Sequence, residues 1–201
     1  MARLTRAESQ ARTRELLIAT ARRLFLRDGY HATSLEKVAE AAGFSKGAVY
    51  SNFATKDELC QVVIDAVRAE QVQAIMAAFG GDGAPADRLA VFRAWAERTI
   101  GDQGWTLLEA EFAVHAARRD PALRARVADG GRAWVAALRA LIEQEAGRRG
   151  VRLPLPAGEL AETLLSLGIG LGLRRAVDPA VSPAALTDMI RLVFEGPPER
   201  G

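Results

Sequence analysis

Small and hydrogen-bonding residues between Ser45 and Lys56 form a pattern suited to contacts with a nucleic acid. The segment Ser45–Asn52 contains a lysine, a tyrosine, two serines and an asparagine, and Lys56 follows four residues later. Hydroxyl, amide and ammonium groups donate hydrogen bonds to phosphate oxygens and to base edges. Gly47 and Ala48 have little or no side chain, so a helix containing them can approach base edges in a major groove about 12 Å wide. The pattern predicts that this segment contacts double-stranded DNA.

The distribution of charge favours the same kind of partner. The formal net charge is only +2 over 201 residues, but residues 1–60 hold ten Lys and Arg against seven Asp and Glu. Residues 1–27 alone hold seven arginines against two glutamates. A basic N-terminal segment before a near-neutral remainder is typical of a segment that meets a polyanion. A solvated, arginine-rich helix face would give the same counts.

The elements expected to position this segment are two helices joined by a tight turn within residues 33–53. Thr33 and Glu36 have the spacing of a capping box, which predicts the start of the first helix at this point. Gly43 supplies the turn, because glycine adopts a left-handed backbone conformation at little cost. Together these signals predict a helix-turn-helix.

The second helix of this motif is expected to start at Ser45, whose side chain can cap it, and to end at about Asn52. Val49 and Phe53 are four residues apart and are expected to face the core. The residues left facing outward are Lys46, Gly47, Ala48, Tyr50, Ser51 and Asn52.

Helical periodicity continues along the chain, and no segment shows the alternation of a β-strand. We therefore predict an all-α fold of about nine helices, with a domain boundary that separates residues 1–55 from 56–201. The first expected helix covers about residues 8–28. The helices expected after the helix-turn-helix cover about residues 56–79, 86–100, 105–118, 121–148, 157–176 and 183–195.

The stretch from Leu16 to Leu59 resembles the TetR family of one-component transcriptional regulators. The matching residues lie on both sides of the helix-turn-helix, which makes the resemblance more specific than that motif alone. They are Phe25, Gly29, Tyr30, Thr33, Ser34, Val38, Ala39, Ala42, Gly43, Ser45, Lys46, Gly47, Tyr50, Phe53, Lys56 and Leu59. The resemblance implies a DNA-binding domain over residues 1–55 and an effector-binding and dimerisation domain over residues 56–201.

The resemblance also implies roles for individual residues. The DNA-binding set is Thr33, Ser34, Ser45, Lys46, Gly47, Ala48, Tyr50, Ser51, Asn52 and Lys56. Within it, Tyr50 and Lys56 match phosphate-binding positions. Thr33 and Ser34, at the start of the first helix of the motif, match further phosphate-binding positions. Lys46, Gly47 and Ala48 match positions near base edges. Ala48 departs from the common threonine and retains a methyl group that can contact a thymine methyl.

Large apolar residues in the second domain are candidates for the lining of an effector cavity or for an ordinary core. The candidate set is Met76, Phe79, Trp95, Trp105, Glu111, Phe112, His115 and Trp134. Glu111 and His115 are four residues apart and would share a helical face, so they could orient a small apolar or aromatic effector or pair with each other. No further His or Cys accompanies them, so no metal site is expected. The single cysteine, Cys60, is expected to be a buried thiol.

The last two helices are candidates for a dimer interface, because the resemblance implies that they pair with their twins as a four-helix bundle. Apolar stripes and closely spaced glycines support this prediction, since small residues let helices approach each other. An internal helix contact is the alternative. The candidate interface residues are Leu164, Leu167, Gly168, Leu171, Gly172, Leu186, Met189, Ile190 and Val193.

Composition excludes several other classes of protein. The sequence has no apolar run near the 20 residues of a membrane-spanning helix and no apolar core of a signal peptide, so a cytoplasmic protein is expected. No nucleophile–base pair or cofactor-binding motif is present, so neither an enzyme nor a cofactor is expected. The resemblance instead implies a homodimeric, ligand-responsive repressor. Two recognition helices about 34 Å apart would bind a near-palindromic operator. A dimeric DNA-binding protein without an effector is the alternative.

Overall fold

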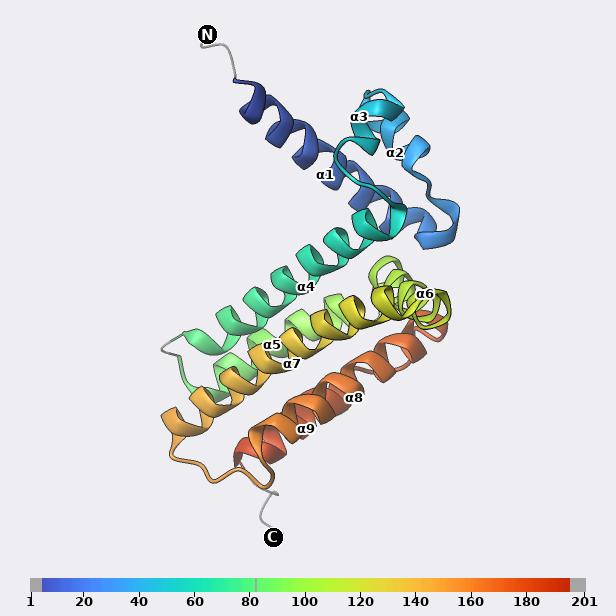
Figure 1. The fold of residues 1–201 in the computed structure, drawn as a ribbon. Helices are drawn as coiled ribbons and strands as arrows, with labels where there is room; N and C mark the ends of the chain where they lie inside the picture. The colour runs from blue at the N-terminus through green and yellow to red at the C-terminus, as the bar shows by residue number, and fades with distance from the viewer. Residues whose placement is uncertain (1–4, 82, 196–201) are drawn as a thin grey trace. The chain divides into compact units, whose positions relative to one another are not determined.

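The computed structural model describes residues 5–81 and 83–195, and every regular element in these ranges is an α-helix. The predicted all-α class and number of helices are therefore confirmed (Figure 1). The helices of the described chain are α1 (Arg6–Ala32), α2 (Leu35–Ala42), α3 (Lys46–Tyr50), α4 (Lys56–Gly80), α5 (Pro85–Thr99), α6 (Gln103–Arg119), α7 (Pro121–Arg149), α8 (Ala157–Val177) and α9 (Ala184–Glu195). None of these helices combines the length and the apolar character that crossing a membrane requires.

Helix α1 is longer than predicted at both ends. It begins after Thr5, which forms a capping box with Glu8: Thr5 accepts a hydrogen bond from the Glu8 N–H, and the Glu8 carboxylate accepts from the Thr5 N–H. Gly29 has a φ of 82°, a left-handed conformation that favours glycine. The predicted end at Gly29 therefore corresponds to a kink, after which α1 continues to Ala32.

The cap of α2 differs from the prediction by one residue. Ser34, and not Thr33, is the N-cap, and its side chain accepts a hydrogen bond from the Lys37 N–H at 3.2 Å. The Thr33 side chain is buried, and its hydroxyl donates to the Gly29 carbonyl at 2.9 Å. The kink in α1 interrupts the regular backbone hydrogen bonds there, and Thr33 binds the carbonyl at that point.

The turn and the second helix of the motif follow the prediction closely. Gly43 closes α2 in a left-handed conformation with a φ of 73°. Ser45 caps α3 by accepting a hydrogen bond from the Ala48 N–H at 3.2 Å. Helix α3 ends at Tyr50, two residues before the predicted end, and Asn52 lies in the following turn.

The described chain divides into two compact units, and the first is larger than the predicted domain of residues 1–55. It extends to Val67 and also includes Leu107–Val127. The physical reason is apolar burial, because side chains from the start of α4 and from α6 and α7 are almost fully buried along with those of α1 to α3. These added core residues are Leu59, Val63, Leu108, Phe112, Ala116 and Leu123.

The second unit comprises Arg68–Thr106 and the described chain from Ala128 onward. Its core draws on α4, α5, α7, α8 and α9, and α9 packs against both α5 and α8. A buried carboxylate, Glu145 on α7, pairs with Arg88 on α5 at 2.9 Å and with Arg149 one turn further along α7. These pairs compensate the charge of a side chain that is only 3% exposed.

Candidate nucleic-acid interface

Helix α3 presents one face to the core and the other to solvent. Val49 and Phe53 are 0% and 1% exposed, as predicted from their spacing. Lys46 and Gly47 are exposed at the start of the helix, and Ala48 is half-buried. This arrangement leaves the first turn of α3 open along its outer surface while its inner face is anchored. A short helix held in this way can offer its first turn to a groove.

Tyr50 lies on the outer face of α3 and is held by a carboxylate of α2. Its side chain is 51% exposed, and its hydroxyl donates a hydrogen bond to the Glu36 carboxylate at 2.8 Å. The backbone N–H of Glu36 and then the Tyr50 hydroxyl hold the pKa of that carboxyl below its usual value. The same bond raises the pKa of Tyr50, so its hydroxyl remains a donor at neutral pH. Tyr50 must leave Glu36 before it can donate to a phosphate.

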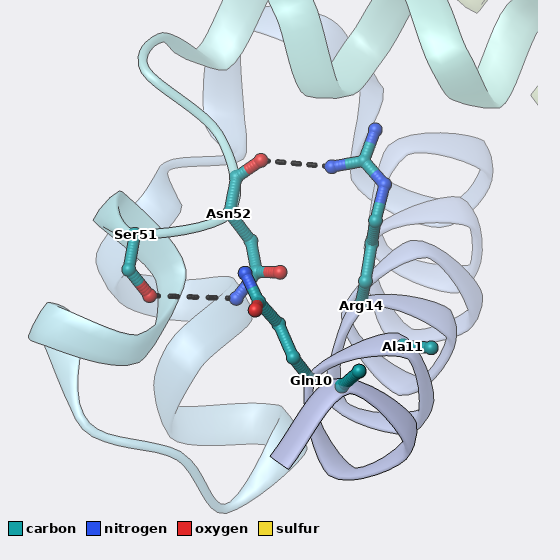
Figure 2. A pocket seen from close by; sticks show the side chains of 6 residues that line it. Gln10, Ala11, Arg14, Ser51 and Asn52 are labelled. Atoms are coloured by element: carbon teal, nitrogen blue, oxygen red, sulfur yellow. Dashed lines mark hydrogen bonds between the residues drawn. The ribbon is translucent and has the colours of Figure 1, made fainter.

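A shallow hollow lies between the start of α1 and the end of α3 (Figure 2). Its volume is about 340 Å³, and it is lined by Ala7, Gln10, Ala11, Arg14, Ser51 and Asn52. The Arg14 guanidinium donates to the Asn52 carbonyl at 2.8 Å and lies 4.2 Å from the centre of the Phe53 ring. Arg14 thus ties α1 to the turn after α3. Sequence reasoning missed this role, for which the only signal was the arginine-rich character of the first segment.

Ser51 and Asn52 both use their side chains to close α3. The Ser51 hydroxyl and the Asn52 amide each donate to the Ala48 carbonyl, at 2.9 and 2.8 Å. The Asn52 amide also reaches the Ser51 hydroxyl (Figure 2). Their predicted contact with DNA stays a prediction, and it has to compete with these bonds.

Lys56, at the start of α4, lies against Tyr30 rather than extending freely. Its ammonium donates to the Tyr30 carbonyl at 3.0 Å and lies 4.0 Å from the centre of the Tyr30 ring. Burial lowers the pKa of Lys56, while Asp57, Cys60 and Glu111 raise it. The sequence placed Lys56 among the DNA contacts but did not identify Tyr30 as its support.

The eight predicted effector residues are divided between the two units. Glu111, Phe112 and His115 belong to the first unit, where they surround Tyr30. The spacing of Glu111 and His115 correctly put them on one helical face. That face lies in the first unit beside Tyr30. The contact of these three residues with an effector stays a prediction.

The remaining five lie in the second unit. Phe79 is buried, and Trp95 is partly buried against the core; both rings contact Phe92. Trp105 is also buried, whereas Met76 is 49% exposed. Trp134 is half-buried and lies with its ring 5.6 Å from the Arg68 guanidinium. Phe79 and Trp95 therefore pack in the core of the second unit, and the contact of these five residues with an effector stays a prediction.

The predicted dimer residues are largely used inside the chain. Leu171, Gly172, Leu186, Ile190 and Val193 are buried within the second unit. A Cβ added at Gly168 would lie 3.8 Å from the Leu186 side chain, so this glycine faces α9 of its own chain. Helix α9 packs against α8 and α5 of its own chain, and these side chains are buried in that packing.

A different apolar stripe remains exposed on the same two helices. On α8 it consists of Ile169, Leu173 and Val177, which are 41%, 39% and 84% exposed and four residues apart. On α9 it consists of Met189 and Leu192, which are 39% and 40% exposed. Only Met189 belonged to the predicted set, so the exposed face is rotated from the one that the sequence pattern favoured.

No group of three or more His, Cys, Asp or Glu side chains suited to a metal ion occurs among the residues described here. The two histidines, His31 and His115, have ring centres 6.2 Å apart. Their surroundings are aromatic rings and the Asp57 carboxylate, which lies 3.2 Å from His115 Nε2.

Sequence and structure comparisons place these features among known proteins. Residues 17–63 match the model of the tetR family of bacterial regulatory proteins, and residues 85–194 match that of the C-terminal domain of BetI-type transcriptional repressors. The regulator TtgR of Pseudomonas putida is 40% identical over 67 residues, 33% of this chain. That match spans 31% of TtgR, about a third of its length.

Solved structures extend the likeness over nearly the whole fold. The reduced form of Escherichia coli NemR superimposes with a TM-score of 0.73 at 18% identity, covering 92% of this chain and all of that one. FadR of Bacillus subtilis, solved in complex with stearoyl-CoA, gives a TM-score of 0.67 at 14% identity, covering 92% of this chain and 99% of that one. These TM-scores establish a shared fold. Because the two family models match the helix-turn-helix and more than half of the remaining length, the chain belongs to the TetR family of bacterial regulatory proteins.

Proposed function

We propose that this protein is a sequence-specific, DNA-binding transcriptional regulator that acts as a homodimeric, ligand-responsive repressor in the cytoplasm. The observation that carries the proposal is the anchoring of α3. Val49 and Phe53 bury its inner face, while Lys46 and Gly47 stand exposed on its first turn. A short, capped helix with small and cationic residues outward has the shape and the donors for a major groove.

The proposed DNA contacts divide into reading and positioning groups. Lys46 and Ala48 would face base edges, with Gly47 and Ser45 allowing close approach of the backbone. Tyr50, Lys56 and Ser34 would bind phosphates, which position a protein on DNA without reading its sequence. The buried Thr33 hydroxyl already donates to Gly29, so its side chain is omitted from this group.

The proposed dimer uses the exposed stripe of α8 and α9 rather than the buried one. Ile169, Leu173 and Val177 follow one face of α8, and Met189 and Leu192 are exposed on α9. Large apolar side chains exposed along one face of a helix are candidates for an interaction surface. A second copy of the chain would bring two α3 helices to successive major grooves of a near-palindromic site.

The proposed effector is a small apolar or aromatic molecule bound in the second unit, as FadR of Bacillus subtilis is solved with stearoyl-CoA. Trp134 supports this site, because its indole Nε1 is buried and has no hydrogen-bond acceptor among the described residues. Leaving such a donor unsatisfied costs about 1–3 kcal/mol. An effector with an oxygen acceptor would satisfy it, and its binding would favour a conformation with lower DNA affinity.

The test begins with selection of bound duplexes from a random DNA pool by the purified protein, followed by a salt titration on the selected duplex. We expect a near-palindrome with nanomolar affinity and a steep salt dependence. Recovery of no enriched sequence, from protein that mass spectrometry shows to be free of small molecules, would exclude the proposal.

The selected duplex then serves to screen effectors. A compound that binds the protein and weakens DNA binding about 5- to 150-fold would show coupling between two sites. Trp134→Phe keeps the aromatic surface but removes the Nε1 donor, and it should reduce the affinity for that compound while leaving DNA binding unchanged. A protein that binds DNA but responds to no bound compound would instead be the dimeric DNA-binding protein without an effector.

A further inference from the structure

Tyr30 is the centre of a network that joins three helices of the first unit. Its side chain is almost fully buried, and its hydroxyl donates to the Asp57 carboxylate at the start of α4. The same hydroxyl lies 3.0 Å from His115 Nε2 on α6. The Tyr30 backbone N–H donates to Glu111, also on α6, at 2.8 Å. Side chains 81 and 85 positions away in sequence therefore fix both ends of this residue.

The Glu111 contact depends on the kink in α1. A Cβ at Gly29 would lie 2.8 Å from one Glu111 carboxylate oxygen and 3.1 Å from the other. Because Gly29 has no side chain, the Glu111 carboxylate has room to approach the end of α1. The kink and the carboxylate form one matched arrangement rather than a chance surface contact.

Lys56 rests on the residue that this network fixes. Its ammonium group donates to the Tyr30 carbonyl and lies over the Tyr30 ring. An ammonium has three donors, so two remain for a DNA phosphate. A lysine side chain loses much conformational freedom when it is ordered, and a contact that orders it beforehand removes that cost from binding.

We propose that Glu111 and His115 on α6 are positioning residues for DNA binding, because through Tyr30 they hold the Lys56 ammonium in place for a phosphate. This inference rests on the proposed function and deepens it. It moves both residues from the effector site, where their spacing had suggested a role, to the support of a DNA contact. Neither residue touches DNA in this scheme.

The first test is a double-mutant cycle on the duplex selected from the random pool. Lys56→Ala should weaken binding about tenfold and lower the salt slope by about 0.9 for each protomer that engages a phosphate. Glu111→Ala and His115→Ala should each lower affinity and slope in the same direction. In the Lys56→Ala background they should have no further effect, because the group that they position is gone.

Two controls separate positioning from general damage and from charge. Glu111→Gln keeps an acceptor oxygen for the Tyr30 N–H and should restore most of the affinity and slope. Glu15→Ala removes a negative charge from an exposed site of the same unit, which should strengthen DNA binding if it changes it at all. The proposal would be overturned if Glu111→Ala lowered the DNA affinity by the same factor in the Lys56→Ala background as in wild type. Such a loss would come from general damage to the structure.

The second test needs no DNA and uses the fact that the chain has lysines only at positions 37, 46 and 56. Selective ¹³C labelling of lysine gives three Cε–Hε signals, one for each lysine. The Hε protons of Lys56 should be shifted upfield, because they lie near the face of the Tyr30 ring. Glu111→Ala should move this signal toward the other two, and Glu111→Gln should not. An unmoved signal in Glu111→Ala overturns the inference while leaving the proposed function standing.

The failure of the proposed function itself has a different signature. If the wild-type protein selects no duplex, regulation through DNA fails, and the inference fails with it. If wild type binds but Lys56→Ala keeps the full salt slope, DNA binding stands and the phosphate contact of Lys56 is refuted, together with its positioning.

Discussion

The side chains around α3 differ in whether they are already engaged by their own chain. Lys46 extends into solvent, whereas Tyr50 is held by Glu36, and Lys56 by Tyr30. An exposed side chain on the first turn can adapt to a base edge, while an engaged one offers a fixed donor to a phosphate. At the scale of single residues, the proposed reading residue is therefore free of the intramolecular contacts that hold the two proposed positioning residues.

We predict that Lys46→Ala loses specificity more than general affinity. Removing a base contact should cost about 1–3 kcal/mol on the selected duplex and much less on random DNA. Competition binding on both duplexes measures the difference, with Lys37→Ala as the control because Lys37 is also exposed but lies on α2. Equal losses on the two duplexes would assign Lys46 to a phosphate instead.

We predict that Glu36→Gln strengthens DNA binding, on the order of threefold at low salt. The substitution removes a negative charge beside Tyr50 and weakens the bond that Tyr50 must give up. The pKa of Glu36 is below its ordinary value, so the carboxylate is already ionised above the ordinary glutamate range and loses its charge only at lower pH. The gain should therefore be constant between about pH 6 and 8.

The measurement is a titration of the selected duplex at several pH values. Glu40→Gln is the matched control, because Glu40 is an exposed carboxylate on the same helix. A gain for Glu40→Gln as large as that for Glu36→Gln would show that only the overall charge matters.

We predict that Cys60 is unreactive in the folded protein. It is 0% exposed, and burial raises the pKa of its thiol well above the usual value, so little thiolate is present near neutral pH. Alkylation by iodoacetamide at about pH 7.5, followed by mass spectrometry, should be slow in buffer and fast in denaturant. Rapid labelling of the native protein would instead point to local opening at the start of α4.

At the scale of elements, two glycines with similar φ angles differ in their ψ angles, 174° at Gly29 and 25° at Gly43, and in their neighbours. Gly29 and Gly43 have φ values of 82° and 73°. A Cβ at Gly43 would meet no atom within 4 Å, whereas a Cβ at Gly29 would collide with Glu111. Gly43 therefore serves a turn alone, whereas Gly29 also serves a contact between helices.

This difference predicts an order of stability. Gly43→Ala should lower the free energy of unfolding by about 1–2 kcal/mol from backbone strain. Gly29→Ala should cost more, because its backbone lies in a region open almost only to glycine and because an added Cβ also displaces Glu111. Urea denaturation followed by circular dichroism gives both values. A smaller loss for Gly29→Ala than for Gly43→Ala would mean that Glu111 moves aside without cost.

At the scale of the whole molecule, the proposed dimer depends on which face of α8 and α9 is left exposed by the packing inside the chain. The exposed stripe of Ile169, Leu173 and Val177 is apolar, and the buried stripe is already occupied by the chain's own core. The proposed dimer should therefore be sensitive to charge on the exposed stripe.

We predict that Ile169→Glu produces monomers at micromolar concentration, because a charge buried in an apolar interface without a partner is costly. Light scattering coupled to size-exclusion chromatography measures the mass. Val91→Glu is the control, since Val91 is an exposed aliphatic residue on α5. A dimer that persists in Ile169→Glu but is lost in Val91→Glu would move the interface to α5.

The sequence alone was enough to predict several features whose cause is local, although it put the cap of α2 one residue early and missed the capping box of Thr5. Helix starts at Ser45 and Pro121, the left-handed turn at Gly43, and the burial of Val49 and Phe53 follow from caps, glycine and periodicity. These depend on interactions within a few residues, which the order of residues specifies directly. The resemblance to TetR regulators came from the same short region.

The tertiary structure decided which of several chemically similar faces meets which partner. It placed Glu111 and His115 beside Tyr30, and it buried Leu186 while leaving Leu173 exposed. Periodicity shows that a helix has an apolar or polar face, but not what covers that face, because the covering residues are distant in sequence. The contacts of α6 with Tyr30, on which the proposed support of Lys56 rests, are therefore visible only in the folded chain.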